Sequence, residues 1–209
     1  MTKKLIGKIK KLKSNKVGQL VKQRMQELER NFESEHSVFS ELCFCITTAN
    51  SSAEMGLKVQ EALGGRLEGY DNNSLAEKLR SLGYRFYNKR AEYLIEARQN
   101  WQNIKEIVSE FKDENIAREW LVENILGFGY KEASHFLRNV GYKNIAILDR
   151  HVLRVMHEHA MIKELPKTLT RKKYLEYEKK LEMICKATQL SQGELDFYLW
   201  YLKTGRVLK

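Results

Sequence analysis

The chain has 209 residues, 43% of them hydrophobic, so it can bury a full hydrophobic core, and disorder of the whole chain is excluded. Lysine and arginine number 37 against 27 acidic residues, a net charge of +10 that favours a polyanionic partner such as nucleic acid or an anionic membrane surface. Three cysteines without a CxxC pair exclude a four-cysteine zinc site or iron–sulfur cluster and fit a reducing cytoplasm better than a disulfide framework.

The first fifteen residues, MTKKLIGKIKKLKSN, are strongly basic, and their longest apolar run is the pair Leu5-Ile6. A secretory signal needs a longer apolar stretch, so we expect a loose basic arm at this end of the chain. No later segment is apolar over a length that would span a membrane. The expected location is therefore the cytoplasm, and no membrane partner is expected.

Helical periodicity runs through the whole chain. Apolar residues recur at steps of three and four, and the clearest sets are Val17, Leu20, Val21, Leu28 and Phe32, and then Leu94, Ile95, Trp101, Ile104, Val108 and Phe111. No segment sustains the strict alternation that a half-buried strand requires. The sequence therefore predicts an all-α fold.

Helix boundaries are marked by capping motifs and breaks. A serine followed three residues later by glutamate predicts three helix starts, at Ser51 with Glu54, Ser74 with Glu77 and Ser191 with Glu194. Further helices are expected at 113–126, 131–140, 149–161 and 170–189, with Pro166 in the break before the last. With nine or ten helices and short connections, residues 1–209 are expected to form a single compact domain.

The two helices within residues 113–140 are joined by the tight segment GFGY at 127–130. Its two glycines supply backbone angles that other residues resist and let the chain approach a ligand closely, while Phe128 can enter the core. The second helix offers free N–H groups and its positive dipole end to an anion, and on this basic chain the obvious anion is a DNA phosphate. The glycines alone fit equally well a hairpin that binds nothing.

Lys131 lies in the first turn of that second helix, where the helix dipole disfavours a cation. It can be a solvated lysine beside a phosphate, or an amine nucleophile that must lose its proton from a pKa of about 10.4. The dipole contributes about 0.3–1 kcal/mol, less than the ~1.4 kcal/mol of one pKa unit. Burial or a neighbouring base would have to supply the rest of the activation.

Asp149 follows the buried-looking run 145–148 and precedes a helix. The simplest interpretation is an N-cap, which is common for aspartate and stabilises a helix by about 1 kcal/mol. A carboxylate held by helix N–H groups stays ionised, so beside a reacting sugar it could also stabilise an oxocarbenium-like charge or relay a proton. Capping and catalysis are compatible.

The segment 127–131 followed by Asp149, 18 positions after Lys131, resembles the helix-hairpin-helix DNA glycosylases of the endonuclease III superfamily. The blocks GYRFYNKRAEYL, GYKEASHFLRN, AILDRHVLR and LDFYLWYLKTGRVLK, which start at residues 83, 129, 146 and 195, resemble the small archaeal-type 8-oxoguanine DNA glycosylases. The resemblance implies two interleaved helical subdomains that carry a helix-hairpin-helix motif, with the DNA and base pocket between them.

In that family the lysine is the nucleophile and the aspartate its partner, which implies Lys131 and Asp149 here. Lys131 would attack C1′ and expel 8-oxoguanine while Asp149 offsets positive charge on the sugar. The resulting Schiff base would lose a C2′ proton and break the 3′ phosphodiester by β-elimination. This chemistry needs no metal or redox cofactor. It requires the nucleotide to leave the base stack, at a cost of a few kcal/mol.

The resemblance also implies a base pocket. It places Trp200 and, opposite, Phe86 as aromatic walls, and Lys209 at the base edge. The spacing of Leu195 and Leu199, continued by a leucine at 202, favours instead a Trp200 that is packed in the core, and the two interpretations stay open.

The expected DNA contacts are the hairpin residues Gly127, Gly129 and Tyr130, together with Arg90, which would contact the base left unpaired, and Asn50, which would fill the gap in the duplex. Either of the last two could instead be an ordinary surface or helix-terminal polar residue.

The sequence departs from the wider superfamily at Leu126, where many hairpins carry proline, and in lacking a cysteine quartet. The absent quartet argues against the iron–sulfur branch of the superfamily. No cysteine pair lies near His151, His157 and His159, so we interpret these as surface histidines and expect no metal site.

Two other functions stay open beside an 8-oxoguanine glycosylase and AP lyase. One is a helix-hairpin-helix glycosylase for another lesion, and the other is a noncatalytic DNA-binding module in which Lys131 only contacts phosphate. The expected partner is double-stranded DNA containing 8-oxoguanine, bound by a monomer that is associated with the nucleoid.

Overall fold

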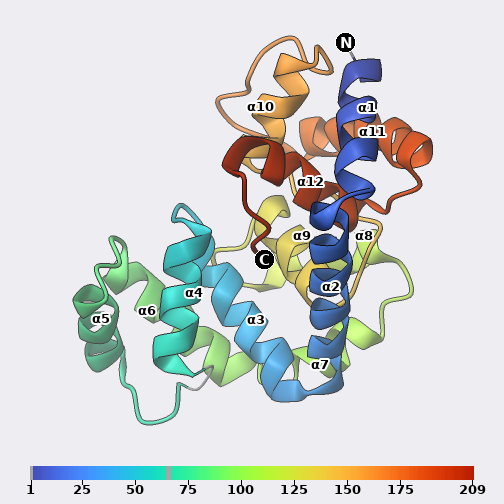
Figure 1. Cartoon of the computed structure of the whole chain (residues 1–209). Helices are drawn as coiled ribbons and strands as arrows, with labels where there is room; N and C mark the ends of the chain where they lie inside the picture. Colours follow the sequence, from blue (N-terminus) through green and yellow to red (C-terminus); the bar gives the residue numbers. More distant parts are fainter. Residues whose placement is uncertain (1, 65–66) are drawn as a thin grey trace. The chain divides into compact units, whose positions relative to one another are not determined.

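The computed structural model describes residues 2–64 and 67–209 (Figure 1). Within these residues it contains twelve α-helices and one short 3₁₀ helix, and no strand, which confirms the all-α prediction. The helix number exceeds the expected nine or ten because α1 (Thr2–Lys13) and the six-residue α7 (Ile104–Ser109) carry no capping motif. No helix in the described part of the chain has both the length and the apolar character to cross a membrane.

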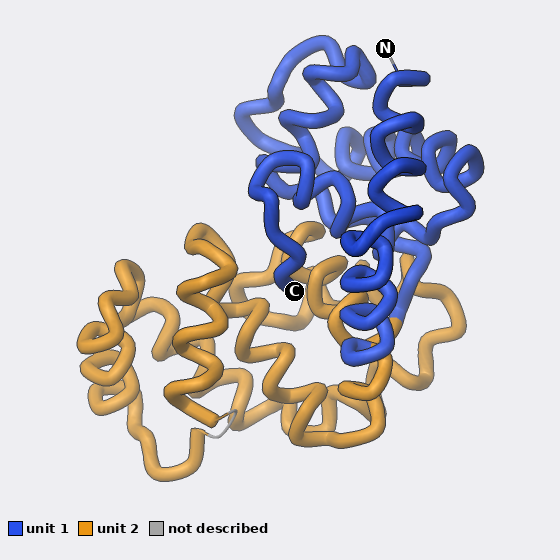
Figure 2. Tube along the Cα trace, in the orientation of Figure 1, with its two compact units in different colours: residues 1–28, 142–209 blue, residues 29–141 orange. Residues whose placement is uncertain are grey.

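The chain forms two compact units (Figure 2). Unit 1 comprises Met1–Leu28 and Tyr142–Lys209, and unit 2 comprises Glu29–Gly141. The chain thus begins in unit 1, passes through unit 2 and returns, as expected of two interleaved subdomains. Unit 1 holds α1, most of α2 (Lys16–Arg30), α10 (Arg150–Glu158), α11 (Arg171–Thr188) and α12 (Gln192–Thr204). Unit 2 holds η1 (Asn31–Glu33), α3 (Glu35–Thr48), α4 (Ala53–Leu63), α5 (Asn72–Ser81), α6 (Tyr87–Asn100), α7, α8 (Glu114–Asn124) and α9 (Tyr130–Asn139).

The expectation of a loose N-terminal arm is wrong. Residues from Thr2 form α1, which packs against α11 with Leu5 and Ile9 0% exposed. The ammonium of Lys13 donates hydrogen bonds of 2.8 and 3.0 Å to the carbonyls of Thr188 and Gln189, at the end of α11 where carbonyls lack partners within the helix. This helix was not predicted because its buried apolar pair, Leu5 and Ile9, is surrounded by lysines in the sequence.

The segment 145–148 in unit 1 is buried but not helical, so its backbone groups need other partners. Side chains of α11 supply them. The carboxylate of Glu178 accepts from the Ala146 N–H at 2.7 Å, and the Tyr174 hydroxyl accepts from the Leu148 N–H at 3.2 Å and donates to the Ala146 carbonyl at 2.7 Å. These bonds fix the chain immediately before Asp149.

Helix α3 is the centre of unit 2 and is buried on nearly every side, as expected of a helix that is covered all round by others. Its one buried carboxylate, Glu41, accepts from the Asn139 amide of α9 at 2.8 Å and from the Gln60 amide of α4 at 3.2 Å. Asn139 also accepts from Arg138 at 3.0 Å. The buried polar network therefore ties the hairpin helix α9 to the core of the unit.

Of the three predicted capping boxes, only the one at Ser191 and Glu194 is observed. Helix α4 is capped by Ser52 rather than Ser51, and at α5 Asp71 is the N-cap while Ser74 is the third helical residue of the box. Leu20, expected on the apolar face of α2, is half exposed. These errors concern register, and they leave the existence of the helices unchanged.

Candidate active site

The predicted hairpin is formed by α8 and α9 (Figure 1). Gly127 has φ +87°, and a Cβ there would lie 2.6 Å from ring atoms of Tyr93, so both backbone angle and packing require glycine. Gly129 has φ −113°, an extended conformation open to any residue, so the expectation of an unusual angle is wrong there. Phe128 is buried, 6.3 Å from Phe136 between ring centroids, as expected.

A buried arginine locks the two hairpin helices together. The Arg118 guanidinium donates to Asn115 at 2.9 Å and to Ser134 at 3.3 Å, and lies 5.5 Å from the ring centroid of Tyr130. Tyr130 in turn donates its hydroxyl proton to the Glu119 carboxylate. Contacts from α8 thereby hold the first turn of α9, which fixes the direction in which the N–H groups of that turn point.

Lys131 is the second residue of α9, and its side chain is 26% exposed. Its ammonium lies 3.6 Å from Oε1 of Glu132, whose other oxygen accepts from the Gly129 N–H at 3.3 Å. The amine is thus partly withdrawn from water at the N-terminus of a helix. This arrangement suits an anion bound to the backbone next to a reactive or phosphate-binding amine.

Arg90 is not a surface residue, because it is 6% exposed. It donates to the Ala49 carbonyl at 2.7 Å and to the Tyr84 hydroxyl at 3.3 Å. Burial raises the pKa of Tyr84, which keeps this phenol neutral and able to donate to the Thr47 carbonyl at 2.6 Å. Arg90 therefore fixes the end of α3, where Asn50 is exposed in a left-handed conformation with φ +58°.

Tyr93 connects this turn to the hairpin. The Arg90 guanidinium lies 5.3 Å from the centroid of the Tyr93 ring, and that ring is the one against which Gly127 packs. The structure therefore brings the Asn50 turn, Arg90 and the hairpin loop together within unit 2. Sequence reasoning missed Tyr93, although its spacing of three from Arg90 on α6 was a signal that the two side chains meet.

Phe86 precedes α6 and is 39% exposed. The Arg85 guanidinium lies over its ring at 4.4 Å from the centroid. An exposed aromatic ring next to an arginine offers a surface on which a base can stack.

Asp149 is the N-cap of α10, as the simplest interpretation predicted. Its Oδ1 accepts from the N–H groups of His151 and Val152, both at 2.8 Å. Its Oδ2 accepts no hydrogen bond from the residues that the structure describes. One oxygen thus orients the carboxylate while the other stays open to a ligand, so capping leaves room for a catalytic role.

Trp200 lies near this cap within unit 1. Its ring meets that of His151 edge to face, with 5.9 Å between centroids, where α12 packs on α10. Leu195 and Leu199 are fully buried, as expected for the core stripe of α12, whereas Trp200 is only partly buried. A core-packing role alone therefore does not account for this tryptophan.

The tail after α12 turns at Gly205, which has φ +70°. The Arg206 N–H donates to the Thr204 hydroxyl at 3.3 Å, and Lys209 is partly buried. In the last turn of α12, the Lys203 ammonium pairs with the Glu158 carboxylate and thereby lowers the pKa of Glu158.

Among residues 2–64 and 67–209, no three His, Cys, Asp or Glu side chains are grouped as metal ligands. His157 is exposed, but His159 is buried, so the expectation of three surface histidines is wrong for His159. It ends α10, and its N–H donates to the Val155 carbonyl in the final turn.

Comparison with known proteins finds relatives along nearly the whole chain. A family described as 8-oxoguanine DNA glycosylase matches residues 21–190. A relative from Methanocaldococcus jannaschii named 8-oxoguanine DNA glycosylase/AP lyase is 51% identical over 206 residues, which cover 98% of this chain and 99% of the relative. A relative of the same name from Korarchaeum cryptofilum is 46% identical over 205 residues, which cover 98% of each chain.

Solved structures agree. The M. jannaschii 8-oxoguanine glycosylase/lyase in complex with 15mer DNA containing 8-oxoguanine matches with a TM-score of 0.94 and 51% identity, covering 98% of this chain and 99% of that one. The 8-oxoguanine DNA glycosylase of Thermotoga maritima matches with a TM-score of 0.93 and 42% identity, over 100% of each chain. A trapped endonuclease III–DNA covalent intermediate, at 16% identity and a TM-score of 0.57, shares the fold over 91% of this chain and 88% of that one.

Proposed function

Because the chain belongs to the 8-oxoguanine DNA glycosylase family, we propose that it excises 8-oxoguanine from duplex DNA and then cleaves the strand as an AP lyase. The observation that carries this proposal is the nearly full-length match to relatives of that name. A partly buried lysine at the N-terminus of the second hairpin helix agrees with it.

The hairpin binds a phosphate of the DNA backbone. The first N–H groups of α9 have no partners within the helix, and the helix dipole favours an anion at this end. Gly127 lets the loop come close to the strand, and the Arg118–Tyr130 contact holds the helix end in place. Such a contact carries no base preference, so it positions the strand and leaves the choice of base to the pocket.

Lys131 is the nucleophile. Its amine forms a bond to C1′ as the N-glycosidic bond breaks, and the electron pair of that bond leaves with the base. Ring opening gives a Schiff base, which loses a proton from C2′. The electron pair released at C2′ forms a double bond, and the 3′ phosphate leaves by β-elimination.

Asp149 stabilises the positive charge that develops on the sugar as the base departs. Two backbone N–H groups hold Oδ1, and the acceptor positions of Oδ2 remain open. A fixed, ionised carboxylate needs little reorganisation to meet a developing cation, which is the condition for effective electrostatic catalysis.

The partly exposed rings of Trp200 and Phe86 supply stacking surfaces for the extruded base, and Lys209 contacts its polar edge. Asn50 enters the gap that the base leaves. Arg90 holds the Ala49 carbonyl next to Asn50 and contacts the base left unpaired. The protein acts as a monomer on double-stranded DNA in the cytoplasm, at the nucleoid, without a resident cofactor.

Borohydride trapping tests the proposal. Incubation of the protein with a duplex that contains one 8-oxoguanine, in the presence of borohydride, should give a covalent protein–DNA adduct, and an undamaged duplex should give none. A panel of duplexes with other single lesions distinguishes an enzyme of different specificity. If no duplex in the panel gives an adduct while binding persists, the protein is a noncatalytic DNA-binding module.

A further inference from the structure

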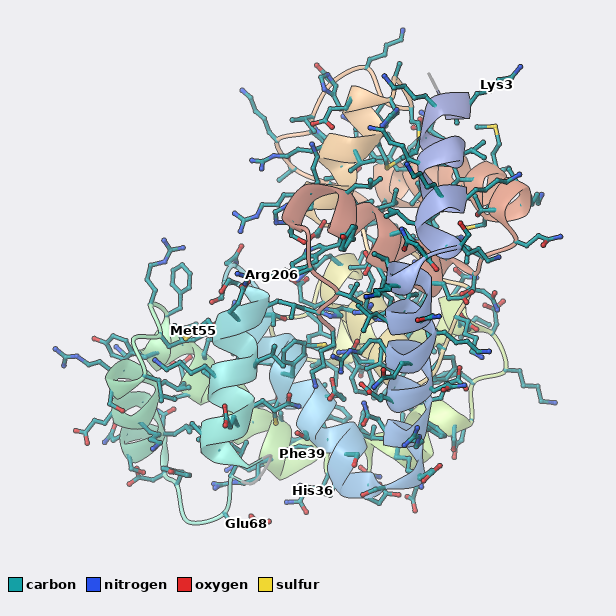
Figure 3. The ribbon with its side chains drawn as sticks, viewed as in Figure 1. Lys3, His36, Phe39, Met55, Glu68 and Arg206 are labelled. Atoms are coloured by element: carbon teal, nitrogen blue, oxygen red, sulfur yellow. The ribbon has the colours of Figure 1, made fainter. Side chains whose placement is uncertain are left out.

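The outward face of α1 carries a dense set of positive charges with no counterpart in the fold. Four lysines, Lys3, Lys4, Lys10 and Lys11, are exposed and make no side-chain hydrogen bond or ion pair with the described residues. Residues 1–26 contain no acidic residue, the first being Glu27. Figure 3 shows Lys3 extending away from the N-terminal end of the ribbon.

These four lysines share a face with one glycine. Gly7 is four residues from Lys3 and Lys11 and three from Lys4 and Lys10, so on an α-helix it lies between the two pairs. It is exposed, and a Cβ at this position would meet no atom within 4 Å. The fold therefore gives no packing reason for glycine, the least favourable residue after proline in a helix interior.

Both features work against the stability of α1. Lys8 lies four residues after Lys4 and three before Lys11, so like charges repel along the helix, and Lys3 and Lys4 occupy the first turn, where the helix dipole disfavours cations. The opposite face explains why the helix forms nevertheless, because Leu5 and Ile9 are fully buried and Lys13 bonds the end of α11.

We propose that the outward face of α1 is a second nucleic-acid contact, at which the DNA backbone passes over Gly7 between Lys3 and Lys4 on one side and Lys10 and Lys11 on the other. From Lys3 to Lys11 the face is about 12 Å long at 1.5 Å per residue, which matches about three to four phosphates of one strand at 3.4 Å each. Because glycine has no side chain, the DNA backbone can approach the axis of α1 closely at Gly7. Only the identity of the polyanion rests on the proposed function.

An anionic membrane is the competing partner for a basic helix. A helix that lies in a membrane surface inserts its apolar face into the lipid. The apolar face of α1 is already buried in unit 1, so it is not free to insert. The α1 helix belongs to unit 1 and the hairpin to unit 2, so the two contacts are made by different residues.

The test is binding of an undamaged fluorescent duplex, followed by anisotropy over a range of NaCl concentrations. In the variant K3Q/K4Q/K10Q/K11Q, the slope of log affinity against log salt should fall in magnitude by about 0.9 per lost phosphate contact, or about 3 to 4 in total. Affinity at 0.1 M salt should fall by about tenfold or more. Circular dichroism verifies that the variant is folded.

The matched control is K163Q/K167Q/K179Q/K186Q, which removes four exposed lysines from the same unit. It should change the slope by less than about 1. Equal losses in the two variants would mean that only total charge matters, and the proposal would be overturned. Because an undamaged duplex needs no excision, this result is independent of whether the wild-type protein is a glycosylase.

Gly7→Leu tests the close approach separately, since it keeps every charge and improves helix propensity. Affinity should fall several-fold while the salt slope changes little. If Gly7→Leu binds DNA as tightly as the wild-type protein, Gly7 has no role in the contact. Vesicles of anionic phospholipid are the final arm: if the four lysines govern vesicle binding but not DNA binding, α1 is a membrane contact instead.

Discussion

Unit 1 contains 23 lysines and arginines against nine acidic residues, a net charge of +14, whereas unit 2 contains 14 against 18, a net charge of −4. The positive net charge of the chain therefore comes from unit 1, and unit 2 reduces it from +14 to +10. Yet the hairpin and Lys131 belong to unit 2, while Asp149, Trp200 and Lys209 belong to unit 1.

The difference in net charge suggests that the two units have different roles in DNA binding: long-range attraction of DNA by unit 1 and local positioning of the strand by unit 2. A net charge of +14 attracts a polyanion over the Debye length, about 8–10 Å at moderate salt. The negative unit 2 cannot do so, and the hairpin contact that we propose is therefore expected to rely on backbone N–H groups and a few cations such as Lys131. Unit 1 is thus expected to govern the salt dependence of DNA binding, and unit 2 the register of the strand.

The largest expected effect is that of Lys131→Gln. Without the amine there is no Schiff base, so the borohydride adduct should disappear and excision should fall by about a thousandfold or more. Lys112→Gln is a suitable control, because it removes one exposed positive charge from the same unit. DNA binding should fall to a similar, small extent in both variants. An adduct that survives in Lys131→Gln would show that another amine is the nucleophile.

Asp149→Asn should give the next largest effect. Asparagine caps a helix about as well as aspartate, so unfolding in urea and DNA binding should change little. Base release in single-turnover assays should nevertheless fall by about a hundredfold or more, because the charge that meets the sugar cation is gone. Equal losses of binding and base release would instead mean that Asp149 is only a cap.

The positions of Lys131 and Asp149 at helix N-termini were predictable, because both signals are local. Lys131 follows a glycine pair that ends one helix, and Asp149 precedes the apolar pattern of the next. The burial of Arg90 was not predictable, because its partner Ala49 lies 41 residues away in sequence. Long-range hydrogen bonds of this kind leave no periodic trace in the sequence.

Helices could be predicted better than their first residues. The box at Ser191 was correct, since this serine has no competing capping residue immediately before it. At α4 two adjacent serines compete, and at α5 Asp71 precedes two asparagines and Ser74, so the sequence offers several nearly equal caps at each of these helix starts. The helix in the basic N-terminal segment was not predicted, because only two of its residues form the buried apolar face and a short helix of this kind is stabilised mainly by packing, here against α11.

Gly127→Ala tests the local positioning that is assigned to unit 2. A residue other than glycine at φ +87° is strained by about 1–3 kcal/mol, and its Cβ would collide with Tyr93. We expect the free energy of unfolding, measured in urea, to fall by that amount, and DNA affinity to fall by about tenfold.

The matched control for Gly127→Ala is Gly129→Ala. Its backbone is extended, and the added Cβ would lie 3.3 Å from a carboxylate oxygen of Glu132, the end of a flexible side chain. Stability and affinity should therefore change little. If the two variants behave alike, the hairpin loop does not depend on the Tyr93 contact.

The smallest expected effect concerns the charge imbalance itself. The Lys203 ammonium lowers the pKa of Glu158 below its ordinary value. Because the folded pKa is the lower one, the pair stabilises the fold above the unfolded pKa of about 4.3, and this contribution is lost as pH falls through the folded pKa. Glu158→Gln should therefore lower the free energy of unfolding by about a few tenths of a kcal/mol at pH 7, and by nothing well below pH 4.

Glu92→Gln is the counterpart in unit 2, where Glu92, about as exposed as Glu158, pairs with Lys89 at 2.6 Å. Removing an acid raises the charge of unit 1 from +14 to +15 but reduces that of unit 2 from −4 to −3. Added self-repulsion should make the Glu158 variant the more destabilised at low salt, and 1 M NaCl should abolish the difference. Equal losses at low salt would show that each unit responds to its local ion pair and not to its net charge.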